Sequence, residues 1–245
     1  MIASGREVVA LSIDPASMPA SAARARALEL LNPDERARFE RFIPDPPRFQ
    51  FLAGRVLLRA ILGRELGVDP REVAFVEGER GKLALAGESS GGLQFNLSHT
   101  DGLVAAVFAR GAEVGVDVER IDPARSGREI ARRHFAPSEV AALDALQGDR
   151  FAREFFRVWT LKESYIKARG LGLAIPLREF AFSPVPEEAD AEIRIAFTRA
   201  IDDDAARWQF AFFKPTAEHR LAVAVRPADG VRRRVRWERF QADTD

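Results

Sequence analysis

The stretch "VGVDVERID" (Val114–Asp122) alternates valines with other residues, which predicts a β-strand with one apolar face. Asp117 and Glu119 share the other face. Their Cα atoms would lie about 7 Å apart, and two charges at that distance repel by roughly 2.4 kcal/mol at an effective dielectric constant of about 20. Such a pair is most often a solvated face of a strand. A bound cation is the alternative explanation, because it would turn the repulsion into shared attraction.

The composition bounds the class of protein. A chain of 245 residues with 47% hydrophobic residues can bury a real core, as one large domain or two small lobes. The 37 basic and 37 acidic residues balance, which argues against a protein that coats nucleic acid. The absence of cysteine excludes disulfides and thiolate sites. With no secretion signal and no long apolar run, we expect a soluble, cytoplasmic protein that binds neither nucleic acid nor membranes.

The order strand, helices, strands occurs twice, before and after residue 111. We predict helices at 20–31, 33–42, 48–66, 126–134, 137–147 and 151–169, the last closed by Gly170. "LVAAVFAR" and "EVGVDVERI" are expected to form a hairpin across Gly111–Ala112. This order predicts two similar α+β lobes, at 1–111 and 112–228, followed by a C-terminal strand or tail at 229–245.

Two further clusters carry polar side chains that could do chemistry. Ser98, His99 and Thr100 end the strand "QFNLSHT", and their hydroxyl and imidazole groups are good donors to phosphate oxygens. In "WTLKESYIKARG" (Trp159–Gly170), Lys162 precedes Glu163, which shares a helix face with Lys167. Alone, the first cluster is more often a turn and the second a surface helix pair.

Taken together, the clusters favour a metal-assisted attack on a phosphate. Magnesium binds carboxylate oxygens and keeps waters and substrate phosphates as its other ligands. Two carboxylates from the strand and one from the helix, Asp117, Glu119 and Glu163, would suit it. Donors such as His99, Lys162 and Lys167 would then hold a phosphorylated substrate.

Three stretches in this order resemble the 4'-phosphopantetheinyl transferases, in particular the surfactin-synthetase-activating type: "FNLSHT", "GVDVERID" and "FFRVWTLKESYIKARGLGL". The family signature is a glycine–aliphatic–aspartate–aliphatic–glutamate strand, a spacer of some forty residues, and a tryptophan-containing helix with "KES" or "KEA" and a later lysine. Glu163 follows Asp117 by 46 positions, which fits this spacing. The strong similarity covers about residues 93–183, and a weaker one reaches back to "PDERARF".

The resemblance implies an activity and a fold. A serine of an apo acyl, peptidyl or aryl carrier protein would attack the β-phosphate of coenzyme A with Mg²⁺, or Mn²⁺, present. The phosphopantetheine arm would move to the serine and 3',5'-ADP would leave. The implied fold is α+β, with two similar lobes related by a pseudo-twofold and coenzyme A between them, in a monomer. Whether the carriers serve fatty acid, polyketide or nonribosomal peptide synthesis stays open.

The resemblance also assigns residues. Asp117, Glu119 and Glu163 would ligate the metal, and the catalytic groups would be Glu163, which helps to deprotonate the serine, Lys167 and His99. Coenzyme A would contact Arg38, Lys82, Ser98, His99, Lys162 and Lys167. Three positions depart from the pattern of relatives: Leu83 replaces a proline, Gln50 an arginine and Glu35 a lysine.

Two other functions compete with this one. A magnesium-dependent phosphohydrolase of a nucleotide diphosphate would use the same carboxylates, but such enzymes do not share the full motif order. A non-catalytic module that binds coenzyme A or a carrier protein would be expected to lack a metal ligand or the lysine, and this chain has all four residues. For the carrier protein, the arginines of "REIARRHF" (128–135) are a candidate docking surface, as acidic residues tend to surround the modified serine.

Overall fold

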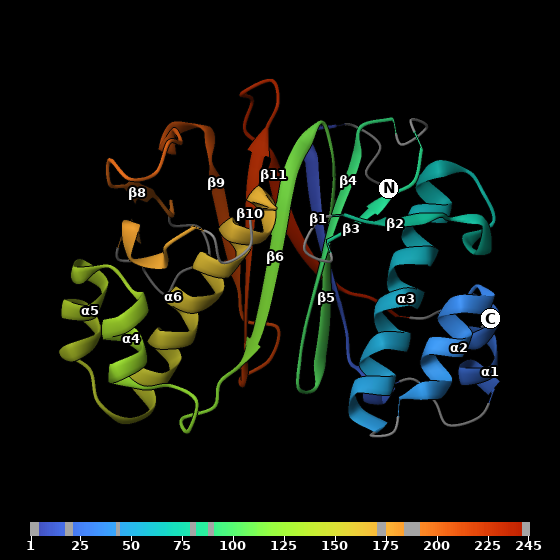
Figure 1. Cartoon of the computed structure of the whole chain (residues 1–245), viewed down its shortest axis with the longest axis horizontal. Coiled ribbons are helices and arrows are strands. Elements are labelled where there is room, and N and C mark those ends of the chain that lie inside the picture. The colour runs from blue at the N-terminus through green and yellow to red at the C-terminus, as the bar shows by residue number, and fades with distance from the viewer. Residues whose placement is uncertain are drawn as a thin grey trace.

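The computed structural model describes residues 5–17, 22–42, 45–78, 82–87, 91–170, 175–183 and 192–241. Its strands form two sheets at the centre, and the helices lie on the two outer flanks (Figure 1). One sheet has the strand order β11 (Arg234–Arg239), β1 (Glu7–Ile13), β5 (Leu103–Arg110), β4 (Leu93–Thr100). The other has the order β6 (Ala112–Arg120), β10 (His219–Pro227), β9 (Gln209–Phe213). The predicted α+β fold is confirmed. In the described part of the chain, no helix has the length and hydropathy needed to span a bilayer.

The two halves of the chain repeat one order of elements. The first half contains β1 (Glu7–Ile13), α1 (Ala22–Glu29), α2 (Pro33–Arg41), α3 (Asp45–Leu66), β2 (Phe75–Glu77), β3 (Leu83–Leu85), β4 (Leu93–Thr100) and β5 (Leu103–Arg110). The second contains β6 (Ala112–Arg120), α4 (Arg128–His134), α5 (Pro137–Asp144), α6 (Gly148–Arg169), β7 (Phe180–Phe182), β8 (Ile195–Phe197), β9 (Gln209–Phe213) and β10 (His219–Pro227). The antiparallel order β1-β5-β4 matches β6-β10-β9, as two similar lobes require.

The two sheets are buried on both faces. Alternate residues of β5, such as Val104, Ala106 and Phe108, pack with α3, whereas Ala105 and Val107 pack against valines of β6 and β10. On the far side of the second sheet, α6 forms the corresponding outer layer. Strands buried on both faces read as continuous apolar runs, which is why β5 has so few polar residues.

The predicted hairpin across Gly111–Ala112 is wrong. β5 pairs with β1 and β4, while β6 pairs with β10 in the other sheet, so the chain changes sheets at Gly111. The hairpin is instead β4–β5, with Thr100 opposite Leu103 across Asp101–Gly102. Gly102 has φ +79°, and an Asp-Gly pair is a strong signal for this kind of two-residue turn.

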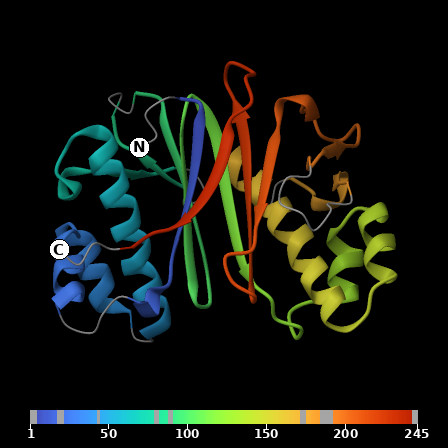
Figure 2. The same cartoon turned by 180° about the vertical axis from the view of Figure 1, so that it is seen from behind.

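The C-terminal strand β11 (Arg234–Arg239) returns to the first half of the chain, where it pairs in parallel with β1 (Figure 2). The Trp237 indole donates a hydrogen bond to Ser12 Oγ at 3.1 Å. The segment that we predicted as a strand or tail after residue 228 therefore forms the edge of the first half's sheet.

The contact between β6 and α6 places the acidic strand beside Glu163 and Lys167. A Cβ added to Gly115 would lie 2.1 Å from the Ser164 carbonyl oxygen and 2.3 Å from the Ala168 amide nitrogen. Only glycine lets the two backbones approach this closely. The glycine of the "GVDVE" stretch therefore brings the helix turns that carry Glu163 and Lys167 against the acidic strand. The helix ends as predicted at Gly170, whose φ is +65°.

Candidate active site

A cleft of about 620 Å³ lies between the two halves, lined by residues of α2, α3, β3, β4 and α6. Five of the residues singled out from the sequence line it: Arg38, Lys82, His99, Glu163 and Lys167. They come from positions up to 129 residues apart in the sequence, and the fold places them around one cleft.

Asp117 lies beside this cleft and is only 3% exposed. Its Oδ1 accepts hydrogen bonds from Lys167 Nζ at 2.6 Å and from Ser98 Oγ at 3.0 Å. Its Oδ2 is buried without a hydrogen-bond partner in the described residues. A buried carboxylate oxygen without a donor is unfavourable, so this atom is available to a ligand that supplies positive charge.

The negative charge of Asp117 affects the two other carboxylates, Glu119 and Glu163. Burial, and then the Asp117 charge, raise the pKa of Glu119 to about 7, against the opposing effects of Arg125 and Lys167. Burial and Asp117 also raise the pKa of Glu163, which Lys167 opposes. The repulsion between Asp117 and Glu119 that the sequence predicted is therefore present, and Asp117 also repels Glu163 on α6.

These residues fit a divalent cation by their donor chemistry. Within the described ranges, no three acidic or histidine side chains stand close enough to form a ready-made metal site. However, the free Oδ2 of Asp117 and two carboxylates with raised pKa values are the oxygen donors that magnesium prefers. A cation would relieve the repulsion that raises those pKa values.

The Ser98 hydroxyl faces the acidic strand. It is buried, donates to Asp117 Oδ1, and accepts from Lys167 Nζ at 2.8 Å and the Val118 amide at 3.3 Å. A hydroxyl has one proton and two lone pairs, so these three contacts use its full hydrogen-bonding capacity. A contact of Ser98 with a phosphate of coenzyme A would require one of these partners to move, and it stays a prediction.

Lys162, which was predicted to contact coenzyme A, does not line the cleft. The side chain is fully buried on the far side of α6, where Nζ donates to the carbonyls of Leu177 (2.9 Å) and Phe180 (2.6 Å). Its ammonium forms an ion pair with Glu139 Oε2 at 2.8 Å. Burial lowers the pKa of Lys162, and Glu139 opposes this shift. The lysine before Glu163 points away from the cleft because adjacent helical residues face different sides.

The remaining predicted residues face the cleft. Lys82 Nζ donates to the Lys167 carbonyl at 2.9 Å, at the C-terminal end of α6, and burial lowers its pKa. Loss of water around the ring, and then Lys167, lower the pKa of His99. Arg38 is exposed, and its guanidinium lies 5.3 Å from the centre of the Phe51 ring.

Arg55 is a cleft residue that we did not predict. Its guanidinium lies near the rings of Phe51 and Phe75, and Nε pairs with Glu35 at 3.2 Å. Glu35 also pairs with Arg59 at 2.8 Å, so one carboxylate serves two guanidinium groups. The sequence signal that could have pointed to Arg55 is the "LAGR" segment (Leu52–Arg55) within the helix predicted at 48–66.

The three departures from the family pattern have structural explanations. Glu35 is turned inward to those two arginines. Gln50 donates from Nε2 to the Thr100 carbonyl at 2.8 Å, which ties α3 to the end of β4. Leu83 lies in β3 and contributes an apolar side chain to the cleft wall.

Comparison with known proteins identifies the family. Residues 113–224 match the 4'-phosphopantetheinyl transferase superfamily, and residues 18–110 match the family described as 4'-phosphopantetheinyl transferase, N-terminal. The chain is 40% identical to the 4'-phosphopantetheinyl transferase HetI of Nostoc sp., over 64% of this chain and 67% of the relative. It is 32% identical to a phosphopantetheinyl transferase of Thraustochytrium sp., over 91% of this chain and 80% of the relative.

A third relative is the 4'-phosphopantetheinyl transferase Sfp of Bacillus subtilis, which is 31% identical over 64% of this chain and 67% of its own length. These similarities run through both halves of the chain, including the β6 and α6 segments that form the acidic side of the cleft. The chain therefore belongs to the 4'-phosphopantetheinyl transferase superfamily and is an enzyme of its surfactin-synthetase-activating type.

Proposed function

We propose that this enzyme transfers the 4'-phosphopantetheine arm of coenzyme A to a serine of an apo carrier protein in a magnesium-dependent reaction that releases 3',5'-ADP. The observation that carries the proposal is the meeting of Lys167 and Glu163 with Asp117 beside a cleft between the halves. The names of the relatives support the transfer of a phosphopantetheinyl group.

The side chains of the cleft suit the steps of this reaction. Glu163, whose raised pKa makes its carboxylate a stronger base, can accept the proton of the serine hydroxyl, directly or through a water. The serine oxygen then bonds to the β-phosphorus, and the bond from that phosphorus to the bridging oxygen of 3',5'-ADP breaks. Lys167 supplies positive charge to the diphosphate, while neutral His99 can hydrogen-bond a phosphate oxygen.

Asp117, Glu119 and Glu163 would hold the magnesium ion. When bound, the ion would neutralise charge on the diphosphate. Arg38 and Lys82, which also line the cleft, would contact the nucleotide of coenzyme A. The lysine would have to leave the carbonyl groups at the end of α6 to do so.

Helix α4 is the proposed docking surface for the carrier protein. Arg132 and Arg133 are exposed on it, as is the apolar side chain of Ile130, at 39%. Arg128 and Arg132 pair with Asp144 at 2.8 and 3.3 Å, so Arg133 offers its charge most freely. An Arg133→Glu variant is expected to raise the KM for an acidic carrier protein while leaving the KM for coenzyme A unchanged, as measured by steady-state kinetics. An unchanged KM for the carrier protein would show that the carrier protein docks on another surface.

The direct test of the reaction is intact-mass spectrometry of a carrier protein. Purified enzyme, apo carrier protein, coenzyme A and magnesium should give a carrier that is heavier by one phosphopantetheinyl group. The gain should vanish without metal and with Asp117→Ala. Cleavage of coenzyme A without carrier modification would indicate a hydrolase. Binding of coenzyme A without either product, across several carrier classes, would indicate a non-catalytic module.

A further inference from the structure

Side chains join the edge strands β4 and β6, which belong to different sheets. Three side chains of β4 accept hydrogen bonds from main-chain amides of β6: Asn96 from Val116 at 3.0 Å, Ser98 from Val118 at 3.3 Å, and Thr100 from Arg120 at 3.1 Å. We call these three contacts the seam ladder. They are evenly spaced because alternate residues of a strand share a face, and alternate amides of an edge strand point away from its paired neighbour.

β4 also lines the cleft. Phe95, Leu97 and His99, which alternate with the residues of the seam ladder, line it, and so does Asn96. One strand therefore both contributes to the cleft wall and links the two halves of the molecule.

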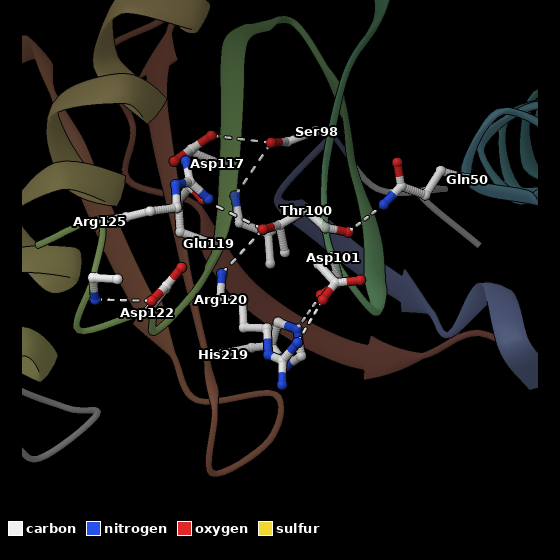
Figure 3. A network of polar contacts seen from close by, with 12 residues as sticks. Gln50, Ser98, Thr100, Asp101, Asp117, Glu119, Arg120, Asp122, Arg125 and His219 are labelled. Carbon is white, nitrogen blue, oxygen red and sulfur yellow. Dashed lines mark hydrogen bonds and ion pairs between the residues drawn. The ribbon is translucent and has the colours of Figure 1, made fainter. Parts of the chain in front are cut away.

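Thr100 makes a second contact through the same hydroxyl (Figure 3). Its Oγ1 accepts from the Arg120 amide and donates to Glu119 Oε2 at 3.3 Å. The hydroxyl is largely buried, since Thr100 is 7% exposed. A hydroxyl whose lone pair is held by a main-chain amide has a fixed oxygen position, so its single proton points to a defined place. Ser98 has the same relation to Asp117 but is also bonded to Lys167, which makes Thr100 the cleaner case.

Arg125 competes for the same carboxylate. Its Nη1 lies 3.8 Å from Glu119 Oε2, and its side chain is 61% exposed. A carboxylate released by Thr100 could turn toward this flexible guanidinium and form a closer pair. The hydroxyl therefore limits how closely the Glu119 carboxylate approaches Arg125.

We propose that Thr100 is a positioning residue, which fixes the Glu119 carboxylate and limits its approach to Arg125, and so sets the affinity of the enzyme for a divalent cation. This inference rests on the proposed function, because it assumes that Glu119 is a metal ligand. It adds a residue outside the three acidic positions, and it ties cation affinity to the contact between the two sheets.

The test measures Mn²⁺ binding by electron paramagnetic resonance, without substrate or turnover, on the full-length protein. Thr100→Val keeps the shape but removes the hydroxyl, and is expected to raise the Mn²⁺ dissociation constant by about 10-fold or more, as loss of a partner of a metal ligand typically does. Thr100→Ser should restore the wild-type value. Asn96→Leu is the matched control, since it removes one contact of the seam ladder that touches no carboxylate. It should lower the melting temperature but leave the dissociation constant unchanged.

The outcomes distinguish failure of the positioning role of Thr100 from failure of the metal role of Glu119. If wild type binds Mn²⁺ and Thr100→Val binds it equally well, or if Asn96→Leu weakens binding as much, Thr100 is merely structural and the inference fails. If wild type binds no Mn²⁺, the metal role of Glu119 fails and the inference with it. Should Thr100→Val not fold, Arg125→Gln tests the same contact from an exposed position. Unchanged Mn²⁺ binding by Arg125→Gln would support Thr100 as the residue that positions the Glu119 carboxylate. Clearly tighter Mn²⁺ binding would overturn the inference.

Discussion

At the scale of single residues, Lys162 and Glu139 form a buried ion pair. The lysine also donates to the carbonyls of Leu177 and Phe180. The carboxylate accepts from the amides of Ala136 and Phe182. We expect Lys162→Met to lower the free energy of unfolding by about 3–5 kcal/mol, because it leaves Glu139 buried and uncompensated. The double variant with Glu139→Gln should lose much less. Urea denaturation measures both. A raised KM for coenzyme A with unchanged stability would instead support a direct substrate contact.

Glu119 gives the metal-free protein a pH dependence. Its pKa is raised to about 7 in the folded protein from an ordinary value of 4.5. The folded state therefore holds this proton more tightly than the unfolded state does, and the stability that results is present below pH 4.5 and lost as the pH rises toward 7. In melting curves without metal, the wild type should lose stability relative to Glu119→Gln between these values. Parallel curves for the two proteins would contradict the shift.

Magnesium should reverse this trend. Because a cation binds the ionised carboxylates, it should raise the melting temperature more at pH 8 than at pH 5.5. The same titration on Asp117→Ala is the control, since that variant lacks the central oxygen donor. An equal rise for both proteins would indicate metal binding elsewhere.

At the scale of elements, the close approach of β6 and α6 depends on Gly115. We expect Gly115→Ala to destabilise the protein by about 3 kcal/mol, because the new Cβ meets backbone atoms of α6 that cannot move independently. It should also reduce the transfer rate by moving α6 away from the acidic strand. Chemical denaturation and the carrier mass assay measure the two effects.

Gly54→Ala in α3 is the matched control. Its Cβ would meet side chains alone: the tip of the flexible Leu97 side chain at 3.1 Å, and Val104 Cγ1 at an ordinary contact distance of 3.7 Å. Alanine also favours a helix over glycine by about 1 kcal/mol, so this variant should be neutral or slightly more stable. Equal losses of stability in Gly54→Ala and Gly115→Ala would show that the close contact of Gly115 with α6 does not cause the destabilisation.

At the scale of the whole molecule, β11 closes the edge of the sheet that begins with β1. A truncation that removes residues 233–245 should lower the melting temperature by about 5–10 °C, since it exposes the edge of β1 and removes the Trp237 contact. Removal of residues 242–245 alone, beyond the described strand, is the control. If the long truncation melts like the full chain, β11 contributes no stability to the sheet.

The sequence by itself determined much of the local structure and the acidic chemistry. Periodicity and caps predicted the long helices and most strands, because these depend on residues within a few positions of one another. The similarity of three motifs predicted the family, which the comparisons confirm. Asp117, Glu163 and Lys167 were chosen from their residue types and spacing, and they lie together.

Only the tertiary structure decided which strands pair and where each polar group points. β5 and β6 are neighbours in sequence but join different sheets, because pairing depends on which apolar faces can be covered, and Gly111 allows the chain to leave one sheet for the other. Lys162 and Ser98 looked like substrate donors, yet their partners come from residues 15 or more positions away. The contact of Thr100 with β6 arises from the approach of two sheet edges. Such long-range contacts leave no periodic signal in the chain, which is why the sequence gives the elements and the chemistry while the fold assigns the roles.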